Sequence, residues 1–116
     1  MAVLTVAKNY MLTQLGGQVD FISLHTAYPP TDGNEISGGS PAYARKAVTW
    51  GTSSSGSISA TNAPVFDVPA GTTVGAVGFY PLATGAVIQA DFDVTDEVFA
   101  GQGTYTVTSA SINLNA

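Results

Sequence analysis

Turn signals divide most of this chain into short segments, and they limit what it can fold into more than any other feature. Clusters of glycine, proline and small polar residues occur at 29–33, 38–41, 52–57, 69–71 and 83–85. They leave stretches that suit short strands better than helices. Short strands separated by turns at intervals of roughly ten residues are typical of an all-β sandwich or barrel.

Between the turns, apolar and polar residues alternate with the period of two that is typical of β-strands. We expect strands over 19–25, 43–50, 65–68, 73–80 and 87–94, with a shorter one around Ile58. In 103–114 the alternation changes phase near Ser109 and Ala110, which predicts a bulge or a strand that ends and begins again. The fold class expected is therefore mainly β, a single β-sandwich of the immunoglobulin-like or jelly-roll-like kind.

The N-terminal segment has helical spacing instead. Its apolar stripe consists of Leu4, Ala7, Met11 and Leu15. Two glycines follow, where helices commonly end. The pattern predicts one short helix over about 5–15, with Thr5 as a candidate N-cap. Because so short a helix is marginal in water by itself, its stripe must pack on the domain's own sheet or on a partner.

The composition indicates one domain, 1–116, with an unusually uncharged surface. Charged residues make up 9% of the 116-residue chain, against about 25% in a typical domain. Such a surface suits a subunit that is partly covered by neighbours, since interface cores are depleted in charge. With a net charge of −5 and only three basic residues, we expect no binding to nucleic acid or to anionic membranes. The absence of cysteine excludes disulfides, thiolate metal sites and cysteine nucleophiles.

No residue pattern predicts catalysis or a cofactor. His25 is the only histidine, and no G-x-S-x-G motif accompanies the many serines. We therefore expect a structural histidine, and an enzymatic role would be excluded if no acid or hydroxyl lay within hydrogen-bond reach of it. Asp91 and Asp93 share one strand face and are weak candidates for a calcium site, with a solvated acidic face as the default.

The expected strand at 43–50 holds two of the three basic residues. Arg45 and Lys46 are adjacent on the expected strand and so point to opposite faces. We expect one of them to pair with Glu35 or Asp32 and so tie the 29–41 loop to the sheet, with a contact to a neighbouring subunit as the alternative. Trp50 is expected in the core or an interface, and Tyr28 is a candidate loop aromatic for binding a receptor or sugar.

Several ordered segments together resemble a family of small virion proteins of tailed bacteriophages, usually labelled tail fibre or minor tail proteins. They are A-K-N at 7–9 with L-G-G at 15–17, S-L-H-T-A at 23–27, N-E at 34–35 with S-G-G-S-P-A-Y-A-R-K at 37–46, V-T-W at 48–50, F-D-V-P-A-G-T-T-V at 66–74, V-G-F-Y at 77–80 and G-T-Y-T-V at 103–107. The family pattern usually has Ala-Asp-Pro after Leu-His-Thr, whereas this chain has Ala27-Tyr28-Pro29-Pro30. The residues of this loop therefore differ from the family pattern.

The resemblance implies a non-enzymatic building block of a virion, assembled in the host bacterial cytoplasm, with no catalytic residue to carry over. Its expected partners are other virion proteins, either of the tail or the major capsid protein, and further copies of itself in a symmetric homo-oligomer. The alternatives are a capsid decoration protein that stabilises the shell and a module that binds a host surface receptor or carbohydrate.

Overall fold

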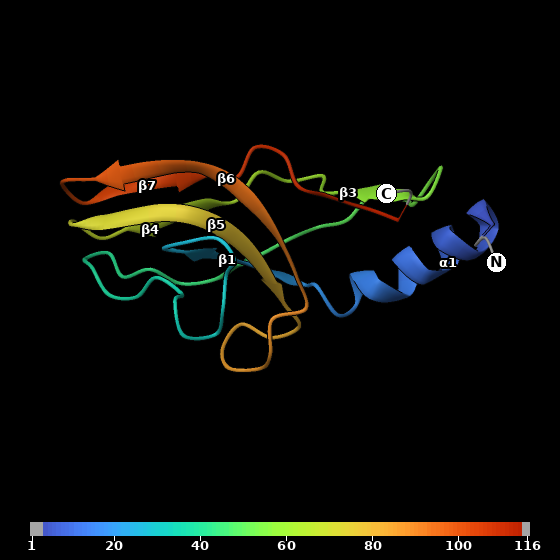
Figure 1. The fold of residues 1–116 in the computed structure, drawn as a ribbon, viewed down its shortest axis with the longest axis horizontal. Helices are drawn as coiled ribbons and strands as arrows, with labels where there is room; N and C mark the ends of the chain where they lie inside the picture. The colour runs from blue at the N-terminus through green and yellow to red at the C-terminus, as the bar shows by residue number, and fades with distance from the viewer. Residues whose placement is uncertain (1–3, 115–116) are drawn as a thin grey trace.

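A computed structural model describes residues 4–114, which form one helix and eight strands (Figure 1). The elements are α1 (Thr5–Gly16), β1 (Phe21–His25), β2 (Lys46–Ala47), β3 (Ser57–Ser59), β4 (Val65–Val68), β5 (Thr72–Tyr80), β6 (Ala90–Phe99), β7 (Gly103–Thr106) and β8 (Ser111–Asn113). The mainly β, sandwich-like fold with one short N-terminal helix is confirmed. Of the expected domain 1–116, residues 1–3 and 115–116 lie outside the described part.

The strands form one four-stranded sheet and two two-stranded ribbons, and every pairing is antiparallel. The sheet has the order β2-β1-β5-β6, and the ribbons are β3–β8 and β4–β7. In Figure 1 the β4–β7 ribbon lies against β5 and β6. Its inward residues Phe66 and Val68 are fully buried in the same apolar cluster as the sheet residues. The ribbon is therefore the layer that faces the sheet.

Alternation along β1 and β5 gives the sheet two different faces. Ile22 lies opposite Phe79 and Leu24 opposite Val77, and all four belong to the buried apolar core. The residues between them point to the other face. There the described loops, not a second ribbon, cover the sheet, so the second half of β5 is buried on both sides.

The loop-covered face carries the polar residues of β1. Ser23 lies opposite Gly78, and His25 lies opposite Ala76 with its ring stacked 6.2 Å from that of Tyr80. Ser23 and His25 are both 0% exposed. Buried polar groups must find hydrogen-bond partners, so this face is where a network of polar contacts is required.

Two expected strands differ from those observed. The segment 43–50 contains only the two-residue strand β2, because its backbone is shared among separate partners: the Tyr43 N–H donates to Gly38, the Val48 N–H to Asp20, and Trp50 bridges to Ala60. The strand expected over 87–94 instead runs from Ala90 to Phe99.

The remaining strand expectations hold more closely. The stretch 103–114 ends as β7 and begins again as β8, which is one of the two expected alternatives. The 52–57 loop is a hairpin turn closed by reciprocal backbone bonds of 2.9 Å between Ser54 and Ser57. At its centre Ser55 and Gly56 both have positive φ, as a tight hairpin turn requires.

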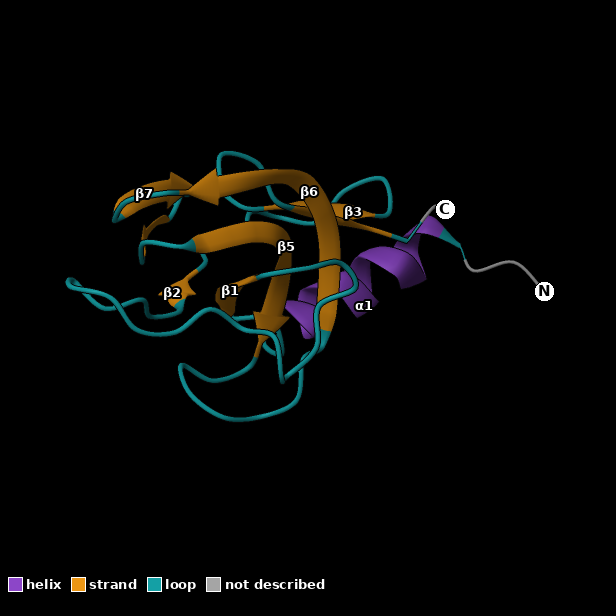
Figure 2. Ribbon diagram, turned by 60° about the vertical axis from the view of Figure 1, so that its left-hand side comes forward, coloured by secondary structure: helices purple, strands orange, loops and turns teal. Residues whose placement is uncertain are grey.

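The helix is held by polar contacts to the 52–57 hairpin turn and by the burial of Leu12. The carbonyl of Asn9 accepts from Ser53 Oγ at 2.9 Å, its Oδ1 accepts from the Gly56 N–H at 2.9 Å, and Thr13 Oγ1 lies 3.2 Å from Ser53 Oγ. Leu12 is the one fully buried helix residue among those described. The hairpin thus holds the helix at one end of the molecule, with the helix N-terminus pointing away from the sheets (Figures 1 and 2).

One detail of the expected helix is wrong. Leu4, not Thr5, occupies the N-cap position, and no side chain caps it. Of the expected apolar stripe, Leu15 packs against the domain's own core, whereas Leu4, Ala7 and Met11 are exposed. At twelve residues the helix, the only one in residues 4–114, has neither the length nor the hydropathy for a membrane span.

We expect Gly78→Ala to lower the free energy of unfolding by about 1–3 kcal/mol, because the new methyl group overpacks the loop-covered face. Its Cβ would lie 2.7 Å from Ser23 Oγ, 2.8 Å from His25 Nε2 and 2.6 Å from Ile88 Cδ1. The matched control is Gly101→Ala, whose Cβ meets no atom within 4 Å. Urea unfolding of both variants checks this, and equal stability would contradict the close packing.

Candidate functional site

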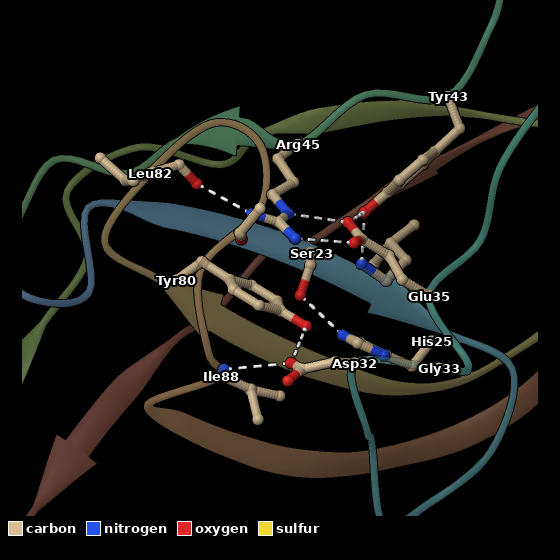
Figure 3. A network of polar contacts seen from close by, with 12 residues as sticks. Ser23, His25, Asp32, Gly33, Glu35, Tyr43, Arg45, Tyr80, Leu82 and Ile88 are labelled. Atoms are coloured by element: carbon tan, nitrogen blue, oxygen red, sulfur yellow. Dashed lines mark hydrogen bonds and ion pairs between the residues drawn. The ribbon is translucent and has the colours of Figure 1, made fainter.

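The centre of the loop-covered face is an ion pair between Arg45 and Glu35 (Figure 3). Arg45 Nε donates to Glu35 Oε2 and Nη2 donates to Oε1, both at 2.9 Å. The two side chains are 8% and 18% exposed. A two-pronged contact of this kind is specific to the planar guanidinium. One of the pairings expected from the sequence is therefore present.

The same guanidinium reaches a third part of the chain. Arg45 Nη1 donates to the carbonyls of Leu82 at 3.0 Å and Gly85 at 2.8 Å. Its Cζ lies 3.5 Å from the centre of the Tyr80 ring, close enough for a cation–π contact. Arg45 thus joins its own segment to the 29–41 loop and to the loop that connects β5 with β6.

Glu35 is held by a second donor, the hydroxyl of Tyr43. Tyr43 donates to Glu35 Oε2 at 2.8 Å and accepts from the Leu24 N–H at 2.9 Å. Burial raises the pKa of Glu35, but the hydrogen bonds from Arg45 and Tyr43 outweigh it and hold that pKa below its usual value. Burial raises the pKa of Tyr43, so its hydroxyl stays protonated and remains a donor.

Asp32, the other expected partner, binds elsewhere. Its Oδ1 accepts from the hydroxyl of Tyr80 at 2.8 Å and from the Ile88 N–H at 3.2 Å. Asp32 therefore ties the same two loops together by a second route (Figure 3). Lys46 lies half-buried on β2 and takes no part in these contacts. The expected link from Arg45 or Lys46 thus runs through Arg45 and Glu35 alone.

His25 sits in a chain of hydrogen bonds next to this network. Ser23 Oγ lies 2.8 Å from His25 Nε2, and Asn34 Oδ1 lies 2.8 Å from His25 Nδ1. The amide oxygen can only accept, so Nδ1 carries the proton and Nε2 accepts from the serine hydroxyl. Burial lowers the pKa of His25, and the hydrogen bond that Nδ1 donates to Asn34 opposes this effect only in part. The neutral ring fits this arrangement.

A serine, a histidine and an amide in this order have the connectivity of a nucleophilic relay. A hydroxyl group, that of Ser23, therefore lies within hydrogen-bond reach of His25. The absence of such a partner would have excluded catalysis, so this criterion does not exclude it. However, Ser23 and His25 are both 0% exposed, and the space beside them is already filled, since a Cβ on Gly78 would lie within 2.8 Å of both. In this geometry the three groups hold the loop; a substrate carbonyl has no room next to Ser23 Oγ.

Asn34 is the residue of this site that the sequence analysis missed. Its Oδ1 also accepts from the Thr31 N–H at 2.8 Å, and its Nδ2 donates to the carbonyls of Ala27 and Pro29 at 3.4 and 3.3 Å. It thereby organises the whole turn between His25 and Glu35, which pair as an isolated bridge. The available signal was its place after Asp-Gly, since Asn side chains commonly bond turn backbones.

Trp50 lines an open groove between the helix and the 48–53 segment. The groove has a volume of about 680 Å³, and its lining includes Thr13, Asp20, Trp50 and Ser53. Trp50 is half-buried, its ring lies 5.7 Å from that of Phe79, and its Nε1 donates to the Val19 carbonyl at 3.0 Å. Trp50 therefore belongs partly to the core, as expected, and partly to a surface.

The other expected site residues lie apart from this network. Asp91 and Asp93 are exposed on β6, on the face opposite half-buried Phe92, as the default acidic face requires. Within residues 4–114 no group of three or more acidic or histidine side chains is placed to hold a metal ion, so the calcium alternative lacks a ligand set there. Tyr28 is 52% exposed.

Comparisons of the chain with protein-family models, with curated proteins and with solved structures find no match.

We expect Arg45→Lys to lower the free energy of unfolding by about 2–4 kcal/mol, because lysine keeps the charge but loses the fork that satisfies Glu35 and the loop carbonyls. The matched control is Lys46→Arg, which we expect to change stability by less than about 0.5 kcal/mol. Thermal or urea unfolding measures both. Equal stability of the two variants would mean that Arg45 does not hold the loops.

We expect stability to fall as the pH drops below 6.5, and His25→Gln to flatten this dependence. The pKa of His25 is lower in the folded chain than its usual 6.5, so the unfolded chain binds more protons below that pH. The contribution is present above pH 6.5 and is lost as the pH falls through the folded pKa. Glu35, whose pKa is also lowered, adds a separate loss only below about pH 4.5.

Urea unfolding of the wild type and of His25→Gln at pH 5, 6, 7 and 8 measures the dependence. At pH 8 the variant is expected to be less stable than the wild type, because it lacks the hydrogen bonds of His25 with Ser23 and Asn34. Since His25 is the only histidine, an unchanged slope in the variant would contradict its assignment.

Proposed function

We propose that this protein is a non-enzymatic structural component of a tailed-phage virion, of the minor tail or tail-fibre type, that acts through repeated protein–protein contacts in a symmetric assembly. The observation that carries the proposal is the helix whose apolar face points away from its own domain. Leu4 is 74% exposed, Tyr10 67% and Met11 43%. Contiguous apolar surface of this kind marks interaction sites in proteins.

The locked loops support the same role. Arg45, Glu35 and Asp32 fix two long loops onto the sheet through short contacts. A rigid surface loses little conformational freedom when it binds, so each repeated contact keeps more of its free energy. The buried Ser23 and His25 stabilise the fold in the same way, and in this proposal they have no chemical task.

The sequence resemblance supplies the setting, which is a virion assembled in the host bacterial cytoplasm. Two positions in the particle fit the proposed mechanism. In the first the protein is part of the tail and binds other tail proteins. In the second it is a decoration protein that binds the major capsid protein and stabilises the shell. Both use the uncharged surface in the same manner and differ in the partner.

Purified particles of the phage that encodes this chain provide the test. We expect mass spectrometry to detect the chain at many copies per particle, and antibody labelling in electron micrographs to locate it at the tail or on the shell. Absence of the chain from particles purified through a density gradient would overturn the proposal. Five- or six-fold labelling at the tail separates the first position from labelling spread over the shell.

A second candidate function, binding of a host receptor or carbohydrate, is favoured by the groove beside Trp50. It places an indole near the carboxylate of Asp20 and the hydroxyls of Thr13 and Ser53, and aromatic surface with a few polar groups is the usual lining of ligand sites. Trp50 is the only tryptophan, so its fluorescence reports on the groove directly. A saturable change in Trp50 fluorescence on titration with host cell-wall sugars would support this function. No change would exclude the groove as the binding site for those sugars.

A further inference from the structure

We infer that the outward face of α1 is a self-association surface, and that its occupant is the same face of a second copy of this chain, packed antiparallel about a two-fold axis. This inference deepens the proposed structural role and rests on it. We call Leu4, Ala7, Tyr10, Met11 and Leu15 the helix apolar face. Leu4, Ala7, Met11 and Leu15 follow one another at spacings of three or four residues, and Tyr10 lies three residues after Ala7. All five therefore share one side of the helix.

Within the described chain most of this face is uncovered, and only Leu15, at its C-terminal end, packs against the buried core. Leu4, Ala7, Tyr10 and Met11 are all exposed, and Leu15 is half-buried. Tyr10, Met11 and Leu15 line a shallow depression together with Gln14 and Gln18. The opposite side of the helix carries Asn9 and Thr13, which bind the hairpin. The side with Leu12, Asn9 and Thr13 is therefore used within the domain, and Leu4, Tyr10 and Met11 remain open to a partner.

Charge favours a second copy as that partner. The described helix contains no acidic residue, and Lys8 is its one basic residue. Two copies packed through this face bring no acidic charges together. The rest of the chain carries eight acidic and two basic residues, with four of the acidic ones, Asp91, Asp93, Asp96 and Glu97, on β6. A self-contact through β6 would oppose like charges, whereas the helix apolar face avoids this.

Shape favours the antiparallel arrangement. Ala7 is small and lies on the face between larger neighbours, so the two helix axes can approach to about 8–10 Å. The helix lies at one end of a molecule that measures 48 × 24 × 21 Å, with its N-terminus pointing outward (Figure 1). Antiparallel helices therefore place the two β-domains at opposite ends, where they do not collide. The opposed helix dipoles also attract each other in this arrangement.

The size of the face suits a dimer that is reversible in isolation. Val6, one turn before Tyr10, is 82% exposed and extends the face. The side chains of one short helix make a small contact, at or below the roughly 1,000 Å² that a specific interface usually buries. Such a contact forms at high local concentration, which is the condition in a symmetric assembly.

Sedimentation equilibrium of the purified chain over roughly 1–300 µM tests the inference. We expect a monomer–dimer equilibrium for the wild type and at least tenfold weaker association for Met11→Lys, which places two like charges in the contact. The matched control is Val98→Lys, at a position 73% exposed on β6, and we expect it to associate like the wild type. Circular dichroism and Trp50 fluorescence check that both variants are folded.

A second measurement uses the absence of cysteine from the chain. We expect Ala7→Cys to form a disulfide-linked dimer rapidly under mild oxidation, and Thr84→Cys, exposed in the loop after β5, to do so slowly. A wild type that is monomeric at all concentrations overturns the inference. So does a Val98→Lys variant that associates as weakly as Met11→Lys, or a Thr84→Cys variant that crosslinks as fast as Ala7→Cys. A monomeric chain that is nonetheless present in purified particles overturns this inference and leaves the proposed structural role standing, with another virion protein on the helix.

Discussion

The guanidinium of Arg45 is the group on which the loop-covered side of the molecule depends. It binds Glu35 with two donors and two carbonyls of the loop after β5 with a third nitrogen, and it lies over the Tyr80 ring. Each contact joins a different segment, so the segments keep their places only together. Breaking a mostly buried pair of this kind leaves an unpaired charge behind, which is why a single residue can have so large an effect.

This lock explains how a small domain buries both faces of its central strand. One face of β5 packs on the β4–β7 ribbon, as in any sandwich-like fold. Within residues 4–114 no second sheet covers the other face, and the loops take that place because Asn34, Asp32 and Glu35 satisfy the buried polar groups there. The Ser23–His25 pair is part of the same solution. A relay that resembles a catalytic one is here a means of placing polar side chains under a loop.

The same principle accounts for the orientation of the helix. Asn9 and Thr13 find partners in the hairpin at 53–56 and Leu12 is buried against the domain, so the apolar residues on the other side of the helix stay exposed. The domain is thus rigid where its loops are fixed and apolar where its helix projects. Both properties suit a subunit that repeats the same contact many times, and they connect the proposed role to the fold without any chemistry at the buried histidine.

The amino-acid sequence by itself determined the fold class, the short helix and most strand positions, because these follow from local periodicity and from turn residues. It also reduced the internal ion pair to Arg45 or Lys46 with Glu35 or Asp32, since two carboxylates lie in the 29–41 loop and the two basic residues follow it closely, with a contact to a neighbouring subunit as the alternative. Only the tertiary structure decided that Glu35 binds Arg45 while Asp32 binds Tyr80, that Asn34 organises the turn, and that the helix stripe faces outward. These outcomes depend on which groups meet across the folded chain, and hydrogen bonds between residues some 45 positions apart leave no trace in local spacing.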